Sequence, residues 1–128
     1  MPRKSLGIMT ESMLYTIMAL QAGPRCGTEI SGFIEKLTGG RVLLGPGTLY
    51  TILSKFLEAG YIREIATEGR KRTYELTAEG KDAYEKELAR MEQCLNDAGK
   101  APYLIMAKGA DSNETEQTQN MPAALPAL

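Results

Sequence analysis

The stretch from Gly45 to Gly80 constrains the fold of this chain more than any other segment. Pro46 suits the first turn of a helix, because its φ is already helical and it lacks an N–H that would be unpaired there. Gly60 supplies the left-handed residue that ends many helices. Between them, apolar residues recur at the spacing of one helix face, at Leu49, Leu53, Phe56 and Leu57. The stretch therefore predicts an amphipathic helix that ends at Gly60.

Two predicted strands follow this helix. Residues 61–67 and 72–77 are rich in aromatic and β-branched side chains, and Glu68-Gly69 marks a turn between them. The turn is followed by three consecutive cations, Arg70, Lys71 and Arg72. Such a run is ordinarily a solubilising turn. Here only one strand separates the run from a helix with a polar outer face, so the three cations become candidate phosphate contacts.

The outer face of the predicted helix is small and rich in hydroxyl groups. It consists of Thr48, Tyr50, Thr51, Ser54 and Lys55. Hydroxyls can bond to phosphates and base edges without the repulsion that a carboxylate would bring, so this face can enter a major groove. Arg41, in the connection before the helix, is a further candidate phosphate contact. The alternative is an ordinary solvated helix face, but the hairpin beside it favours a recognition helix followed by a β-wing.

Several short blocks carry a family resemblance. They are Gly-Pro at Gly23 with Gly-Thr-Glu-Ile at Gly27, Pro-Gly-Thr-Leu-Tyr at Pro46, Leu-Glu-Ala-Gly-Tyr-Ile at Leu57 and Gly-Arg-Lys-Arg-x-Tyr-x-Leu-Thr at Gly69. In this order, over roughly residues 10 to 98, they resemble the PadR family of bacterial transcriptional regulators. The resemblance implies a winged helix-turn-helix that dimerises through a C-terminal helix, binds operator DNA and often responds to a small-molecule inducer.

The expected fold is mainly α within the α+β class: a winged helix-turn-helix domain with a two-stranded β-wing and a C-terminal dimerisation helix. We predict an N-terminal leader over residues 1–9, in which a disordered arm and a helix packed on a partner both stay open. The DNA-binding domain is expected over 10–77, with Thr10 capping its first helix. The C-terminal helix follows over 78–98, with Thr77 as its cap. A disordered or loosely packed tail is expected over 99–128.

An apolar stripe marks the predicted C-terminal helix. Its residues, spaced by four, three and four positions, are Tyr84, Leu88, Met91 and Leu95. This narrow stripe is typical of a two-helix seam, and a helix of ~21 residues is ~31 Å long, more than so small a domain can cover. We therefore expect a homodimer, with Leu14 of the first helix added to the dimer surface. The alternative is that the stripe packs on the first helix of its own chain.

Candidates for an effector site come from the same two helices. They are Tyr15, Met18, Tyr84 and Met91. Methionine side chains suit an adaptable ligand pocket, although core packing is their commoner use. The chain has no Trp, so the stacking of a flat inducer, which the resemblance implies for multidrug-responsive relatives, rests on the tyrosines.

Composition excludes several other functions. The chain has no His, so Ser-His-Asp and Cys-His nucleophile systems cannot be built within it, and the two cysteines lack zinc-site spacing. We predict no enzyme activity, no cofactor and no metal. The net charge of −1 divides into ten Lys/Arg against six Asp/Glu over residues 1–72, a net of +4, and five against ten over 73–128, a net of −5. This asymmetry indicates a basic contact surface on the first half.

The combined prediction is a cytoplasmic, sequence-specific DNA-binding regulator, a homodimeric repressor released by a small-molecule effector. No apolar run approaches the ~18 residues that a membrane span requires, and no signal peptide is apparent. Two alternatives stay open. One is a winged-helix module that binds a partner protein, favoured by the acidic second half and by Glu75 on the returning strand. The other is a ligand sensor without operator binding.

Overall fold

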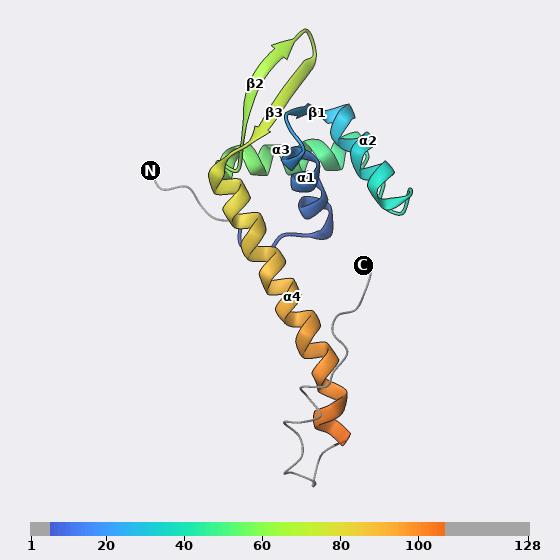
Figure 1. Ribbon diagram of the computed structural model, residues 1–128. Coiled ribbons are helices and arrows are strands. Elements are labelled where there is room, and N and C mark those ends of the chain that lie inside the picture. The colour runs from blue at the N-terminus through green and yellow to red at the C-terminus, as the bar shows by residue number, and fades with distance from the viewer. Residues whose placement is uncertain (1–5, 107–128) are drawn as a thin grey trace. The chain divides into compact units, whose positions relative to one another are not determined.

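The computed structural model describes residues 6–106. Its elements, in chain order, are α1 (Glu11–Gln21), β1 (Arg25–Cys26), α2 (Gly27–Thr38), α3 (Pro46–Ala59), β2 (Ile62–Glu68), β3 (Lys71–Leu76) and α4 (Ala78–Met106) (Figure 1). The chain divides into two compact units between Glu87 and Leu88, within α4. The first unit holds α1 to α3, the sheet and the first turns of α4, and the remainder of α4 belongs to the second unit.

A capping box starts α1. The Met13 N–H donates to Thr10 Oγ1 at 3.2 Å, and the Thr10 N–H donates to the Met13 sulfur at 3.4 Å, which confirms Thr10 as the N-cap. Residues 6–9, the part of the predicted leader that the structure describes, also belong to this unit. Met9 is buried, and its N–H donates to Glu87 Oε2 at 2.7 Å. Residues 1–5 of the leader lie outside the described residues.

The helix α3 has the predicted limits. It begins at Pro46, and Gly60, with φ 81°, ends it in the left-handed conformation. Leu49, Leu53 and Phe56 are buried as predicted, and Ile52 joins them. Leu57, expected on the same face, is 37% exposed, because it lies at the edge of the buried side whose centre Ile52 and Phe56 occupy.

The strands form a three-stranded antiparallel sheet in the order β1-β3-β2. The hairpin of β2 and β3 runs from the pair Ile62 and Leu76 to the pair Glu68 and Lys71, with a register shift between Glu64 and Ala66. Gly69, with φ 62°, lies in its turn. Figure 1 shows this hairpin projecting beyond the three helices of its unit. The strand added to the predicted hairpin is β1, whereas the connection over 41–44 contains no strand.

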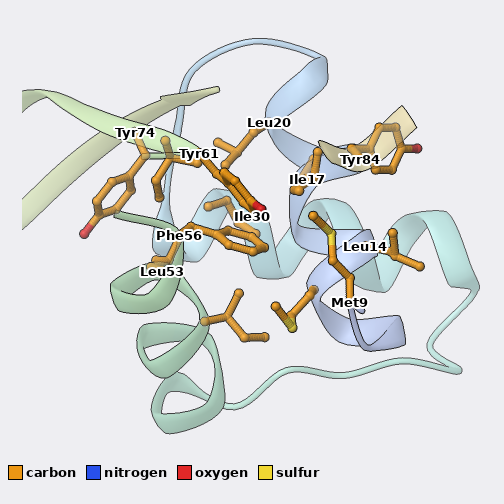
Figure 2. Packing of buried hydrophobic residues seen from close by; sticks show 14 of the residues in the cluster. Met9, Leu14, Ile17, Leu20, Ile30, Leu53, Phe56, Tyr61, Tyr74 and Tyr84 are labelled. Carbon is orange, nitrogen blue, oxygen red and sulfur yellow. The ribbon is translucent and has the colours of Figure 1, made fainter. Parts of the chain in front are cut away.

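One buried cluster joins the helices of the first unit to the sheet (Figure 2). Its largest fully buried side chain is Phe56, whose ring centroid lies 5.9 Å from that of Tyr61. Ile17 of α1 and Ile30 of α2 are also fully buried in it. This cluster fixes α3 against the base of the hairpin, so the two elements expected to contact DNA share one core.

The start of α4 packs closely on the chain between α3 and β2. The Gly80 N–H donates to Thr77 Oγ1 at 3.0 Å, and this hydroxyl lies 2.7 Å from the Gly60 carbonyl oxygen and 2.9 Å from that of Tyr61. A Cβ on Gly80 would lie 2.2 Å from the Tyr61 oxygen. Thr77 caps the helix as predicted, and Gly80 is required by this close approach.

The far end of α4 lies beyond the predicted one. The helix continues past Ala98 to Met106, with Gly99 and Pro102 inside it, so the predicted tail begins too early. A single proline can be accommodated in a helix at the cost of one hydrogen bond and a kink, and the Ala, Lys and Leu residues around it are good helix formers. Residues 107–128 of the predicted tail lie outside the described residues.

Candidate nucleic-acid interface

The polar face of α3 is open to solvent. Its predicted groove residues, Thr48, Tyr50, Thr51, Ser54 and Lys55, are all exposed. They lie opposite the side of the helix that Ile52 and Phe56 bury in the core. The fold therefore brings these five side chains together on one outward surface.

Thr51 is oriented by its own helix. Its hydroxyl donates to the Gly47 carbonyl oxygen at 2.9 Å. Because a hydroxyl has a single proton, Thr51 offers an incoming ligand acceptor lone pairs and a methyl group. Both suit base edges, since the amino groups of adenine and cytosine are donors and thymine presents a methyl group in the major groove.

Tyr50 is exposed over 53% of its surface, yet it lies against α2. A Cβ placed on Gly27 would be 3.5 Å from the Tyr50 hydroxyl oxygen and 3.8 Å from its ring carbon Cζ. The phenol therefore lies beside the first turn of α2 while its remaining surface faces solvent. The sequence placed Tyr50 on the correct helix face, but it carried no signal for this contact between two helices.

The wing cations lie at and beside the turn of the hairpin. Arg70 follows Gly69, Lys71 pairs across the hairpin with Glu68, and Arg72 with Thr67. All three are exposed. Lys71 also lies near the start of α2. There the Cys26 N–H donates to Glu29 Oε1 at 2.9 Å. This hydrogen bond is the main cause of the lowered pKa of Glu29, and the positive charges of Lys71 and Arg25 lower that pKa further.

Glu75, the acidic residue on the returning strand, is paired. Arg63 donates to Glu75 Oε2 from Nε at 2.7 Å, and its Nη2 lies 2.6 Å from the same oxygen. The two residues are also cross-strand partners in the hairpin. The negative charge of Glu75 is thus compensated locally, which weakens the repulsion that it would exert on a phosphate.

Arg41, the other candidate phosphate contact, is bonded to α1. Its Nη2 lies 3.2 Å from Glu11 Oε2 and donates to the Tyr15 hydroxyl at 2.8 Å. The Glu11 carboxylate raises the pKa of Arg41. A phosphate would therefore have to share this guanidinium with Glu11. The same contact ties Tyr15, a predicted effector residue, to the connection before α3.

The predicted dimer stripe divides into buried and exposed parts. Leu14 and Tyr84 are only 3% and 6% exposed and belong to the core of their own chain, so the alternative of packing within the chain holds for these two. Burial raises the pKa of the Tyr84 phenol. Leu88, Met91 and Leu95 are 37%, 43% and 38% exposed. The exposed part of the predicted stripe therefore consists of Leu88, Met91 and Leu95.

Hollows in the first unit include the following two. One, of about 530 Å³, is bordered by Ile8, Tyr61 and the first turns of α4. The other, of about 390 Å³, lies beside the Arg63–Glu75 pair. Neither is lined by the predicted effector residues Tyr15, Met18, Tyr84 or Met91. Over residues 6–106, no cluster of three or more acidic or cysteine side chains could hold a metal ion, and no described helix combines the length and apolar character that crossing a bilayer requires.

Comparison with solved structures gives winged-helix regulators. A transcriptional regulator from Clostridium thermocellum is 27% identical, with a TM-score of 0.62 over 69% of this chain and 89% of that chain. RosR of H. salinarum is 22% identical, with a TM-score of 0.57 over 90% and 91% of the two chains. ZitR of Lactococcus lactis, a zinc-responsive MarR family member, is 18% identical, with a TM-score of 0.51 over 91% and 74%. The last two show similarity of fold alone. Together with the four helices and the small sheet, these likenesses confirm the predicted winged-helix, α+β class.

Comparison of sequences identifies the family. A curated relative, an uncharacterised 37.1 kDa protein in transposon TN4556 of Streptomyces fradiae, is 34% identical over 77 residues, which are 60% of this chain and 22% of that protein. The chain thus spans about a fifth of the length of this relative. The family model of the PadR-like transcriptional regulators matches residues 11–86. This family consists of regulators and not of enzymes, as the sequence predicted. Because the match covers more than half of the 128 residues, the chain belongs to the PadR-like family of transcriptional regulators.

Proposed function

We propose that this protein is a sequence-specific DNA-binding regulator that acts as a homodimeric repressor. The observation that carries the proposal is the exposed, hydroxyl-rich face of α3 beside the exposed cations of the hairpin turn. In this arrangement α3 enters the major groove and the hairpin contacts the flanking backbone. Residues 10–77 form the DNA-binding domain, and the protein acts in the cytoplasm. Release by a small molecule is supported by the family resemblance.

The proposal is tested by fluorescence anisotropy with the full chain at two salt concentrations. The probes are a duplex from the region upstream of its own gene, a duplex selected by the protein from a random pool, and a scrambled duplex of equal length. We expect salt-sensitive binding that prefers the upstream or the selected duplex. Equal, weak binding to all three duplexes would contradict the proposal and favour a winged-helix module that binds a protein partner.

The homodimer is proposed to form through Leu88, Met91 and Leu95 of α4. A stripe with 3.5-residue spacing pairs with a second helix of the same kind, and cyclic dimers match the two-fold symmetry of operators. Met91→Glu places a charge in this seam, so we expect it to shift the protein from dimer to monomer in sedimentation velocity at micromolar concentration. Operator affinity is expected to fall with it.

Ala89→Glu is the matched control for this variant. Ala89 is exposed on the opposite side of α4, so the substitution adds the same charge to the same helix without entering the stripe. It should remain dimeric. A Met91→Glu protein that sediments as the wild type does would refute the proposed seam.

A further inference from the structure

The three cations of the wing are not equivalent in this fold. Side chains two positions apart on a strand share a face of the sheet, so Arg72 lies on the same face as Tyr74, whereas Lys71 lies on the other. The cross-strand partners of Arg72 and Tyr74 on β2 are Thr67 and Glu64 respectively. Arg70, in the turn, belongs to neither pair. Arg72 is thus the only one of the three that shares a face with the buried tyrosine of β3.

Tyr74 is anchored at one end and polar at the other. Only 3% of its surface is exposed, and it belongs to the core cluster. Figure 2 shows its hydroxyl directed away from Phe56 and Tyr61, at the edge of the cluster. Burial raises the pKa of this phenol, and the positive charge of Arg72 opposes the rise. A rigid ring therefore carries its hydroxyl on the face of the sheet that Arg72 shares.

Three elements meet at this point. Tyr74 pairs with Arg25 of β1, and β1 leads directly into α2 at Gly27, against which the Tyr50 hydroxyl lies. Tyr50 of α3 is also near enough to influence the Tyr74 phenol. The acidic group on the same face, Glu64, accepts a hydrogen bond from the Thr67 hydroxyl. Arg72 thus lies on the face of the hairpin from which Tyr74 packs into the core.

We propose that Tyr74 is a positioning residue for DNA recognition, whose hydroxyl holds the Arg72 guanidinium beside Tyr50 so that the two contact the groove together. Arg70 and Lys71 contact phosphates from the hairpin turn. The inference rests on the proposed DNA-binding function. An arginine already held in place loses less side-chain freedom on binding than a free one, and its planar fork can bond the two acceptors of a guanine edge in the major groove.

The test uses Tyr74→Phe in the full chain, which keeps the ring in the core and removes the hydroxyl. Binding is measured by anisotropy to the duplex that the wild type selects from a random pool and to its scrambled counterpart, over a range of salt. We expect specific affinity to fall about three- to tenfold, as loss of one pre-ordered side chain predicts. Affinity for the scrambled duplex and the salt slope should not change, because no phosphate contact is removed.

A double-mutant cycle and a matched control distinguish positioning from a loss of structure. Arg72→Lys should weaken specific binding similarly, and adding Tyr74→Phe to it should cost nothing further. Tyr61→Phe removes a phenol hydroxyl from the same buried cluster and should leave specific binding unchanged.

Three results would overturn the inference: unchanged specific binding in Tyr74→Phe, equal loss in Tyr61→Phe, or additive losses in the double variant. A wild-type protein that selects no duplex would instead refute the proposed function, and the inference with it.

Discussion

Replacing Gly80 with alanine is expected to destabilise the first unit by about 3 kcal/mol, the upper end of ordinary overpacking costs. The added Cβ would lie 2.2 Å from the Tyr61 carbonyl oxygen and 2.8 Å from Leu76 Cδ1. The carbonyl cannot easily retreat, because it accepts the Thr77 N–H at 2.9 Å. The change is measured as the free energy of unfolding in urea, followed by circular dichroism.

Gly32→Ala provides the control for this prediction. Gly32 lies inside α2 and is exposed, and a Cβ added to it would meet no heavy atom within 4 Å. Alanine there should stabilise the protein by up to about 1 kcal/mol, since only helix propensity changes. The two substitutions are chemically identical, so opposite signs would isolate the contact with Tyr61. A Gly80→Ala protein as stable as the wild type would show that this packing is absent in solution.

Removing two charges from the wing is expected to weaken DNA binding regardless of sequence. Each phosphate contact that is lost reduces the slope of log K against log salt by ~0.9, so Arg70→Gln with Lys71→Gln should flatten the slope by ~1.8 per protomer. Both side chains are exposed at the hairpin turn, so the fold should be unaffected. Anisotropy titrations at four or more salt concentrations give the slope.

Two further variants serve as controls for the change in salt slope. Lys86→Gln with Lys100→Gln removes the same number of exposed charges from α4 and should leave the slope unchanged. Thr51→Ala removes an acceptor and a methyl group from the exposed face of α3 without changing charge, so it should alter sequence preference more than the slope. An unchanged slope in the Arg70 and Lys71 variant would contradict the assignment of the wing.

Local signals were sufficient to predict much of the fold. Pro46 and Gly60 mark the limits of α3, Gly69 marks the hairpin turn, and Thr10 and Thr77 cap their helices. Each of these residues acts on its own backbone or on that of a near neighbour, so its effect can be inferred from a short window of sequence. The exposed face of α3 followed in the same way from helical periodicity.

Contacts between distant residues could not be predicted. The two-residue strand β1 exists only because β3 lies beside it, and the tie between Arg41 and Glu11 joins residues 30 positions apart. Nor does a periodic stripe show what covers it. The spacing of Tyr84 and Leu88 is the same as that of Met91 and Leu95, yet Tyr84 is buried in its own chain. A sequence pattern reports that a face is apolar, and the fold decides its partner.

The side chain of Thr77 links three segments of the chain through hydrogen bonds. Its hydroxyl lies within hydrogen-bond distance of the carbonyls of Gly60 and Tyr61, while it accepts the N–H of Gly80. The end of α3, the start of β2 and the first turn of α4 therefore cannot rotate separately without breaking these bonds. A displacement of the first turn of α4 must therefore either carry the end of α3 with it or break these bonds.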